Sequence, residues 1–274
     1  MLAEAPGAVV QTHCTMRLGD NLAHMHFMRG LAKANPDRLF CHRAHWTYLG
    51  QLAAMTTDLP NLSLGEIPAN SLFRTDLKIE HSVDAWKNSD GFWERHPLRN
   101  DYGPFMIEWF KELAARLWTK SPLEKPSDLL FDYPALKSTT PQANVGARSV
   151  LMVNCQPMSG QFRAWSREHF AEMARMLRFQ GMEVSTVDPI PGFPSCREQN
   201  MSVTEIGQFS QNVGIIIGSV TGPMWTTMNV WGAKTVGLRI HLLDSERVDL
   251  TGRELTRQSM AKAHAALDAW RAAQ

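Results

Sequence analysis

Residues 213–238 read VGIIIGSVTGPMWTTMNVWGAKTVGL and carry the clearest secondary-structure pattern in the chain. The apolar run Val213–Ile217 predicts a buried strand of a parallel sheet, and Thr235–Leu238 predicts the next strand. Between them lies a turn of small residues, after which Pro223 suits the first turn of a helix and Gly232 its end. Such a β-turn-α-β unit offers backbone N–H groups at a helix N-terminus, where an anion such as a phosphate can bind.

The rest of the second half shows the same alternation of strands and helices. The predicted elements are a strand at Ser149–Cys155, a helix capped by Ser166 and stopped by Gly181, a strand at Val184–Val187, a helix at Thr204–Asn212 and a final amphipathic helix at Arg253–Ala273. In the helix after Ser166, Phe170, Met173 and Leu177 recur on one face and are expected to point inward.

The first half follows a similar order. We expect a strand at Ala8–His13, a loop at Cys14–Gly19, a helix capped by Asp20 or Asn21 and stopped by Pro36, a strand at Leu39–His42, a helix at Trp46–Met55, a strand at Leu62–Ile67 and a helix at Pro104–Trp118. Residues 85–102 are rich in aromatic and charged side chains without a helical or strand period. They predict a long surface loop of the kind that often serves binding.

The polar segment Lys137–Arg148 contains Pro and Gly and is the best candidate for a linker. Two series of strands and helices on either side of it predict an α/β fold with two Rossmann-like, doubly wound domains, residues 1–140 and 146–274. Ligands of such sheets bind at the carboxyl ends of the strands. We therefore expect the two domains to face one another across a cleft.

The composition is typical of a globular protein and argues against several other classes of protein. The 274 residues are 44% hydrophobic and 20% charged with a net charge of +1, so neither disorder nor nucleic-acid binding is indicated. No apolar run has the length of a membrane span, and residues 1–10 lack the pattern of a signal peptide. The four cysteines show no C-x-x-C spacing, so a zinc site and a disulfide framework are not expected. A cytoplasmic location follows as the default.

Several catalytic motifs are missing. Neither G-x-G-x-x-G nor the P-loop sequence occurs, and Val220 stands where a G-x-S-x-G nucleophile elbow would need serine. No D-x-D pair is present to hold a metal against a diphosphate. If the protein handles a nucleotide diphosphate, cationic side chains and helix dipoles must take the place of a metal ion.

Three segments carry the functional argument: RLGDNL at residues 17–22, MSGQFRAWS at residues 158–166 and GSVTGPMW at residues 218–225. In this order and at this separation they resemble the GT-B glycosyltransferases of the ADP-heptose lipopolysaccharide heptosyltransferase family. The matching elements are Gly19-Asp20 for the family's G-D at the first helix, Arg163-Ala164-Trp165-Ser166 for its K-x-W-P-like element and Thr221-Gly222 for its D-[ST]-G-x-x-H turn.

The chain departs from the family at two positions of the third segment. The family's Asp is Val220 here, and its His is Trp225. Both replacements argue against a heptosyltransferase in the strict sense and describe a divergent member.

The resemblance implies a metal-independent, inverting transfer from a nucleotide-diphosphate sugar to a glycan or glycolipid in cell-envelope biosynthesis, with no further cofactor. The first domain would hold the acceptor and the second the donor, and peripheral contact with a membrane is compatible with this. Asp20 is the expected general base, kept ionised by its helix N-terminus. The expected diphosphate ligands are Ser159, Gly160, Arg163, Thr221 and Gly222.

Plainer interpretations stay open for each of these residues. Asp20 fits a simple helix cap, Arg163 a solvated side chain, and both Trp165 and Trp225 fit core packing. His24 and His26 lie two positions apart and so on different helix faces, which excludes a shared metal site; His13 is a weaker site candidate at the end of the first strand.

Aromatic and cationic residues of the long loop could contact an acceptor sugar or simply fix the loop: Trp86, Trp93, Arg95, His96 and Arg99. Two alternative functions also remain. One is a non-catalytic nucleotide-sugar or glycan-binding protein, and the other is a sugar-nucleotide epimerase or hydrolase on the same scaffold, which would need further carboxylates.

Overall fold

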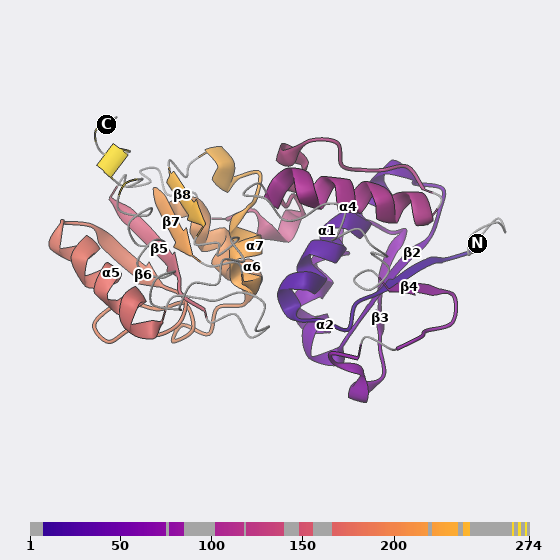
Figure 1. Cartoon of the computed structure of the whole chain (residues 1–274), viewed down its shortest axis with the longest axis horizontal. Coiled ribbons are helices and arrows are strands. Elements are labelled where there is room, and N and C mark those ends of the chain that lie inside the picture. The colour runs from indigo at the N-terminus through magenta and orange to yellow at the C-terminus, as the bar shows by residue number, and fades with distance from the viewer. Residues whose placement is uncertain are drawn as a thin grey trace, which may run out of the picture. The chain divides into compact units, whose positions relative to one another are not determined.

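The computed structural model describes residues 8–74, 77–84, 102–117, 119–139, 148–155, 166–218, 221–234 and 238–241, together with Ala265, Asp268, Ala269 and Ala272. The chain divides into two compact units, unit 1 (Met1–Ala135) and unit 2 (Leu136–Gln274). Each unit contains a four-stranded sheet whose strand pairs are all parallel (Figure 1). The predicted α/β class is therefore confirmed.

Unit 1 contains a parallel sheet with strand order β3-β2-β1-β4. Its elements are β1 (Val10–His13), α1 (Leu18–Ala34), β2 (Phe40–Ala44), α2 (Trp46–Leu52), the short 3-10 helix η1 (Ala53–Met55), β3 (Leu62–Glu66), η2 (Ala69–Ser71), β4 (Ser82–Asp84), α4 (Tyr102–Arg116), η3 (Pro126–Leu129) and η4 (Pro134–Leu136), the last of which crosses into unit 2. The chain runs outward from β1 to β3 and then returns to place β4 on the other side of β1.

Unit 2 contains a second parallel sheet with strand order β6-β5-β7-β8. Its elements are β5 (Ser149–Val153), α5 (Arg167–Phe179), β6 (Glu183–Thr186), α6 (Val203–Phe209), η5 (Ser210–Asn212), β7 (Ile215–Gly218), α7 (Gly222–Thr227), η6 (Gly232–Lys234) and β8 (Leu238–His241). Strand order reverses between β1 and β4 in unit 1 and between β5 and β7 in unit 2. Ligands of doubly wound sheets bind at the carboxyl ends of strands at these reversals.

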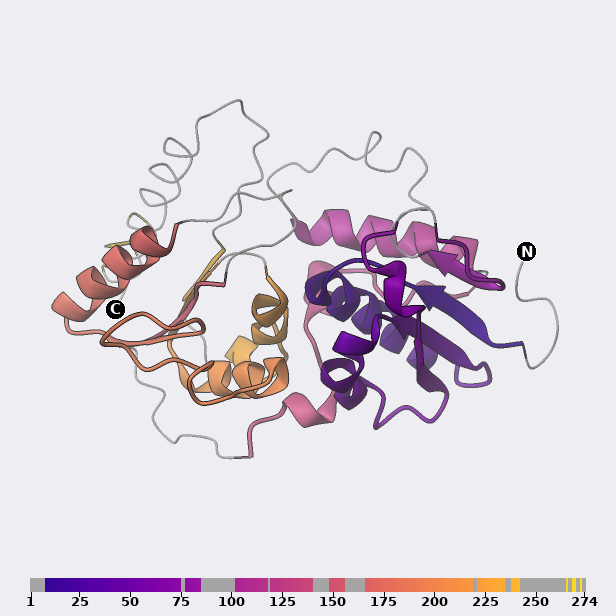
Figure 2. The same ribbon diagram turned by 90° about the horizontal axis from the view of Figure 1, so that it is seen from below.

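Helices cover both faces of the sheet in unit 2 (Figure 2). On one face α5 packs Phe170, Met173 and Leu177 against strand residues such as Val150, as the periodicity predicted. The other face is buried against side chains of α6 and α7. Because a strand buried on both faces has no polar side, the unbroken apolar run Ile215–Ile217 is explained.

Local signals predicted the ends of α5 correctly. The Ser166 hydroxyl accepts a hydrogen bond from the His169 N–H and caps the helix. Gly181 follows the helix at φ +78°, a conformation that glycine adopts without a steric penalty.

Other boundaries were predicted wrongly. α7 ends at Thr227 and not near Gly232, because Met228 leaves the helical region and the Asn229 amide bonds the carbonyls of Gly207 and Thr226. The last strand of the quoted segment begins at Leu238 instead of ending there. The three-residue strand β4 falls outside every predicted element.

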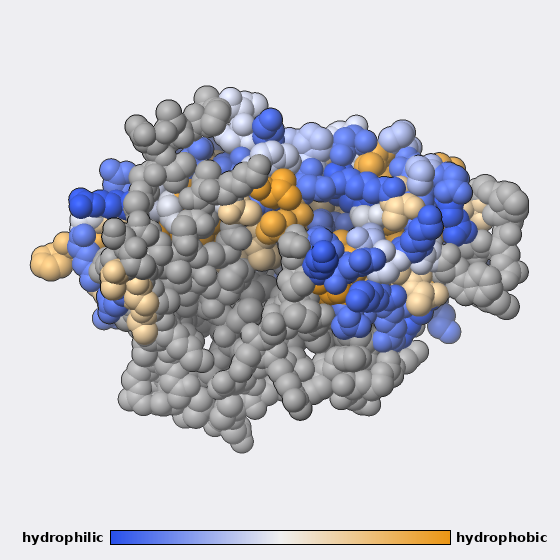
Figure 3. Space-filling model, turned by 90° about the horizontal axis from the view of Figure 1, so that it is seen from above, coloured by the Kyte–Doolittle hydropathy of each residue, from blue (hydrophilic) through white to orange (hydrophobic). Residues whose placement is uncertain are grey.

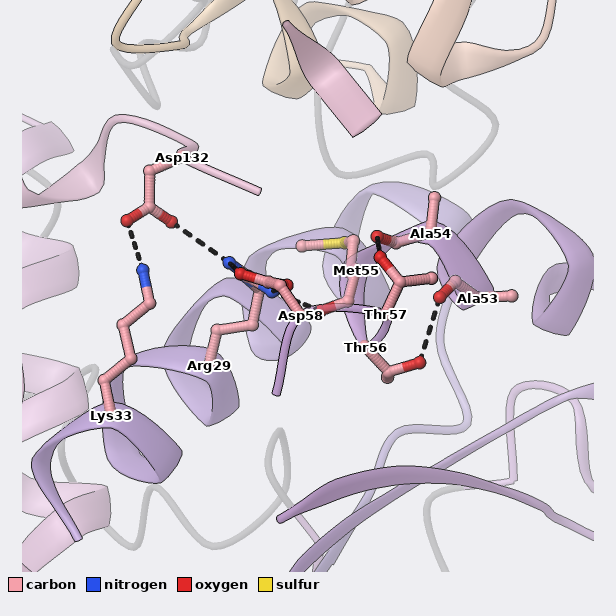
Figure 4. Close-up of polar contacts among 9 residues, drawn as sticks. All are labelled: Arg29, Lys33, Ala53, Ala54, Met55, Thr56, Thr57, Asp58 and Asp132. Carbon is pink, nitrogen blue, oxygen red and sulfur yellow. Dashed lines mark hydrogen bonds and ion pairs between the residues drawn. The ribbon is translucent and has the colours of Figure 1, made fainter. Parts of the chain in front are cut away.

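In unit 1, α1 packs against α4 through stacked Phe27 and Phe110 rings, whose centroids lie 4.9 Å apart. α1 also carries Arg29, a buried guanidinium that forms two hydrogen bonds with the Asp58 carboxylate, at 2.6 and 2.9 Å (Figure 4). Arg29 donates a further bond to the Met55 carbonyl and lies 3.5 Å from Asp132. This network joins α1 to two distant segments of the chain.

Gly218, the last residue of β7, allows a close approach of two strands. A Cβ built on it would lie 2.5 Å from the Val153 Cβ and 2.9 Å from the Val153 carbonyl oxygen. We expect Gly218→Ala to lower the free energy of unfolding by about 1–3 kcal/mol, because β5 and β7 would have to separate. Gly50→Ala is the matched control, since a Cβ there meets nothing within 4 Å and alanine favours helix. Thermal unfolding of both variants checks this, and equal midpoints would contradict it.

The described surface in the view of Figure 3 is mostly hydrophilic with small hydrophobic patches. Within the described ranges, no helix combines the length and apolar character needed to cross a bilayer.

Candidate active site

Three polar side chains meet at the strand reversal of unit 1. The His13 ring, at the carboxyl end of β1, shares a hydrogen bond between its Nδ1 and the Ser82 Oγ at 2.9 Å. Its Nε2 lies 3.9 Å from an oxygen of Asp84, and both side chains are buried. Asp84 was not predicted as a site residue, because the three-residue strand β4 is too short to give a recognisable sequence pattern. It supplies a carboxylate at the place where this fold class binds ligands.

Asp20 lies beside this reversal, in the first turn of α1. The helix begins at Leu18 after Arg17, so neither Asp20 nor Asn21 is its cap, contrary to the prediction. The Asp20 carboxylate instead accepts a hydrogen bond from the Arg17 backbone N–H at 3.2 Å. Asn21 turns inward and donates to the Met16 and Arg17 carbonyls, which fixes the loop that precedes the helix.

The Asp20 carboxyl is a stronger base than its helix position predicted. Burial raises its pKa to about 6, although the Arg17 N–H, its own backbone N–H and the Arg17 charge all act to lower it. The expectation of a readily ionised, weak base considered only the helix terminus and left out desolvation. A carboxylate with a pKa near 6 accepts a proton at neutral pH more readily than an ordinary aspartate.

Two further side chains lie within electrostatic range of Asp20. Burial raises the pKa of the Cys14 thiol well above its usual value, and the charges of Asp20 and Asp84 add to this effect. Burial also raises the pKa of Tyr48, whose phenol lies within electrostatic range of Arg17 and Asp20. Cys14 thus lies within electrostatic range of both carboxylates, and Tyr48 adds a hydroxyl from α2, the helix that follows β2.

Arg17 stacks on an aromatic ring at the same edge of the sheet. Its guanidinium carbon lies 4.3 Å from the centroid of the Phe73 ring. Phe73 has φ +64° and is 44% exposed, and its N–H donates to the Thr15 carbonyl at 2.8 Å. A bulky residue in the left-handed region costs about 1–2 kcal/mol, so this conformation needs an explanation.

Buried histidines lie behind the site. His42 hydrogen-bonds the Thr12 hydroxyl through Nδ1 and the side-chain amide oxygen Oδ1 of Asn21 through Nε2. Because that amide oxygen only accepts, Nε2 carries the proton and Nδ1 accepts from the threonine hydroxyl. Burial lowers the pKa of His42 well below its usual value and that of His24 to about 3. The two rings add no charge to the site at neutral pH.

These histidines make the stability of unit 1 sensitive to acid. In the unfolded chain they bind protons below about pH 6.5, whereas in the folded state they stay neutral, so the free energy of unfolding falls as the pH falls. The free energy of unfolding should therefore fall between pH 6.5 and pH 4, and this fall should be about 2–3 kcal/mol smaller in His24→Leu than in the unsubstituted protein. Urea unfolding at each pH measures the difference. His81→Gln is the control because that side chain is 71% exposed. Parallel stability curves for all three proteins would contradict this assignment.

In unit 2 the strand reversal brings together residues from three strand ends. Thr221 precedes α7 and Gly222 is its first residue. The Thr221 side chain makes no capping hydrogen bond to the helix and acts to lower the pKa of the Cys155 thiol. Burial raises the pKa of Cys155 to about 12. Beyond β6, Asp188 pairs with the Arg197 guanidinium at 2.7 Å. With six residues, α7 has a smaller dipole than the predicted helix would have.

The remaining predicted site residues are not placed by the described structure. Outside it lie Ser159, Gly160, Arg163 and Trp165, and the loop residues Trp86, Trp93, Arg95, His96 and Arg99. Most of the predicted final helix, 253–273, also lies outside it. Within the described residues, no three His, Cys, Asp or Glu side chains converge as metal ligands would.

Comparison with known proteins identifies the fold. No family model and no curated protein matches the sequence significantly. A glycosyl transferase of family 9 from Veillonella parvula matches with a TM-score of 0.52 and 11% identity, over 94% of this chain and 96% of that one. Heptosyltransferase WaaC of E. coli, solved with ADP, matches with a TM-score of 0.51 and 13% identity, over 93% and 99%. The fold is that of the GT-B glycosyltransferases.

This likeness confirms the resemblance first based on three short segments. At 11% and 13% identity it concerns the fold, in which both sheets of the GT-B architecture are present. The sequence predicted Asp20 as a residue of the candidate site, but it did not predict Tyr48, Phe73 or Asp84. Arg17 was part of a quoted motif without a role, because its stacking on a residue more than fifty positions away has no local signal.

Proposed function

We propose that this GT-B protein is a glycosyltransferase that moves a sugar from a nucleotide-diphosphate donor to a glycan or glycolipid acceptor. The observation that carries the proposal is Asp20, a partly buried carboxyl with a pKa near 6, beside the strand reversal where this fold binds ligands. We further propose that transfer inverts the anomeric carbon and needs no metal ion, in the cytoplasm and with peripheral membrane contact where the acceptor is a lipid.

In the proposed reaction Asp20 accepts the proton of the acceptor hydroxyl. The hydroxyl oxygen forms the new bond to the anomeric carbon while the bond from that carbon to the diphosphate breaks, and both electrons leave with the nucleotide diphosphate. The first domain, residues 1–140, would hold the acceptor, and residues 146–274 would hold the donor.

We propose that hydrogen-bonding and cationic groups of the second domain hold the departing diphosphate. Thr221 and Gly222 would offer a hydroxyl and backbone N–H groups, and Ser159 and Gly160 a loop that phosphate can approach. Arg163 would oppose the charge that grows as the nucleotide leaves. Trp225, which stands at the position of the family's histidine, is only 4% exposed and belongs to the core, as predicted. We therefore expect a donor sugar other than the family's heptose.

The test is a thermal-shift screen of the full chain against ADP, GDP, UDP and their sugar conjugates, followed by transfer assays with any donor that binds. A nucleotide sugar that raises the melting midpoint and is consumed only with a glycan acceptor supports the proposal, and NMR of the product gives its anomeric configuration. Binding without turnover, for every acceptor tried, would instead indicate a nucleotide-sugar-binding protein.

A second candidate function is favoured by the His13–Asp84 pair. A sugar-nucleotide epimerase or hydrolase needs further acid and base groups beside Asp20, and this pair supplies a carboxylate and an imidazole at the same strand reversal. Consumption or epimerisation of the donor without any acceptor, lost in Asp84→Asn, would support this function over transfer.

A further inference from the structure

We propose that Asn21 and His42 are positioning residues for the general base Asp20. Together they fix the peptide group between Met16 and Arg17, whose N–H holds the Asp20 carboxylate. The inference rests on the proposed function, because it explains how the carboxylate of that reaction is kept in place.

A series of buried hydrogen bonds runs from the sheet of unit 1 to the loop before α1. Thr12 in β1 and His42 in β2 are register partners, and the Thr12 hydroxyl bonds the His42 Nδ1 at 2.9 Å. The His42 Nε2 donates to the Asn21 Oδ1 at 3.1 Å. The Asn21 Nδ2 then donates to the carbonyls of Met16 and Arg17, at 3.1 and 2.9 Å. Both the oxygen and the nitrogen of the Asn21 amide are therefore in use, and a satisfied buried network of this kind is rigid.

One peptide group connects this network to Asp20. The Met16 carbonyl and the Arg17 N–H belong to the same planar trans peptide group, so they point in opposite directions. The Asn21 amide holds the carbonyl, and the Asp20 carboxylate accepts from the N–H at 3.2 Å. A rotation of the peptide group that broke the first bond would also turn the N–H away from the carboxylate. Asn21 therefore sets the direction of the donor that Asp20 uses.

Stability alone does not explain polar side chains at these positions. Replacing both partners of a buried hydrogen bond by apolar side chains of similar shape is nearly neutral for stability. Such side chains would fill the same space but could not hold the loop carbonyls. Asn21 and His42 are both 0% exposed, so they act through the loop and not on a bound ligand.

The test measures the pKa of the Asp20 carboxyl by NMR titration of its carboxyl carbon in the full chain, without donor or acceptor. In Asn21→Ala and His42→Leu the loop should loosen and admit water. Because burial is the largest cause that raises this pKa, we expect it to fall from about 6 toward the usual aspartate value of about 4. In transfer assays the rate should fall about 10–100-fold with an unchanged KM for the donor, and the acid limb of its pH profile should move to lower pH.

A second substitution of His42 separates positioning from folding. Glutamine carries its amide nitrogen as many bonds from the backbone as the imidazole Nε2, so His42→Gln keeps a donor for Asn21. It should retain the Asp20 pKa and the transfer rate that His42→Leu loses. Asn61→Ala is the matched control, because the Asn61 amide donates to three backbone carbonyls at the other end of α1. It should lower the melting midpoint and leave the pKa of Asp20 unchanged.

An Asp20 pKa that is the same in the unsubstituted protein, Asn21→Ala and His42→Leu would overturn the proposal, as would an equal fall in Asn61→Ala. If Asn21→Ala does not fold, the comparison of His42→Leu with His42→Gln decides, and equal values in those two variants would also overturn it. The titration requires no turnover, so its failure would leave the proposed transfer reaction intact. A shifted pKa in a protein that transfers no sugar would instead count against the proposed function alone.

Discussion

Asparagine in place of Asp20 should lower the rate of sugar transfer by about 10²–10⁴-fold, because removal of a general base costs this much. Binding of the nucleotide should be unchanged, since the residues assigned to the diphosphate belong to the second domain. The asparagine amide would keep an oxygen that accepts the Arg17 N–H, so the loop before α1 should retain its structure. Steady-state kinetics and nucleotide titrations of both proteins check the two halves of this expectation.

The pH dependence supplies an independent readout. The rate should fall below about pH 6, where the partly buried Asp20 carboxyl becomes protonated. Because folding raises the pKa of Asp20 from its usual value, the ionised carboxylate lowers the stability of the folded state, and this cost is fully present above about pH 6 and disappears as the pH falls toward 4. Asp20→Asn should therefore be at least as stable as the unsubstituted protein at pH 7.

A matched control separates catalysis from a general loss of charge. Asp37→Asn removes an exposed carboxylate from the turn after α1 and should leave the rate and its pH profile unchanged. Unaltered turnover in Asp20→Asn would remove Asp20 from the mechanism, and equal losses in both variants would show that charge alone is responsible.

The fold was predictable where short stretches of sequence carry their own signal. Ser166 and Gly181 mark the ends of α5 through side-chain capping and a positive φ, and the apolar run before Gly218 marks a strand buried on both faces. β4 has no such signal, because three residues that read Ser-Val-Asp become a strand only when β1 is available to pair with them. Tertiary context determined that element.

The candidate site shows the same division. Asp20 was predicted from its motif, but its pKa depends on burial by segments that are distant in sequence, and the helix terminus alone gave the wrong direction. Phe73 and Arg17 are 56 positions apart. Phe73 has a positive φ, which can be predicted from sequence only where the residue is glycine. A sequence motif can therefore identify a candidate catalytic residue, whereas the packing of distant segments determines the pKa of that residue.

Loss of the Asp58 carboxylate should strongly destabilise unit 1 while leaving the site residues untouched. Asp58→Ala would leave the Arg29 guanidinium, 1% exposed, with Asp132 at 3.5 Å as its remaining carboxylate partner among the described residues (Figure 4). A buried charge that loses its partner costs about 3–5 kcal/mol, and the remaining carboxylate favours the lower end. Hydrogen exchange of α1 peptides measures this change where Arg29 lies.

Replacing Arg29 should lower the free energy of unfolding by less than replacing Asp58. This difference between the two partners is the sharper test. Arg29→Met removes the charge from the core and leaves carboxylates at Asp58 and Asp132, whose side chains are 27% and 37% exposed and therefore reach water. Arg29→Met/Asp58→Ala should then be more stable than Asp58→Ala alone, since the unpaired charge is gone. Glu112→Ala, which breaks a half-exposed pair with Arg116 on α4, should cost under about 1 kcal/mol. Additive losses in the double variant would mean that packing of the arginine side chain, and not its charge, stabilises the contact between α1 and the segment after η1.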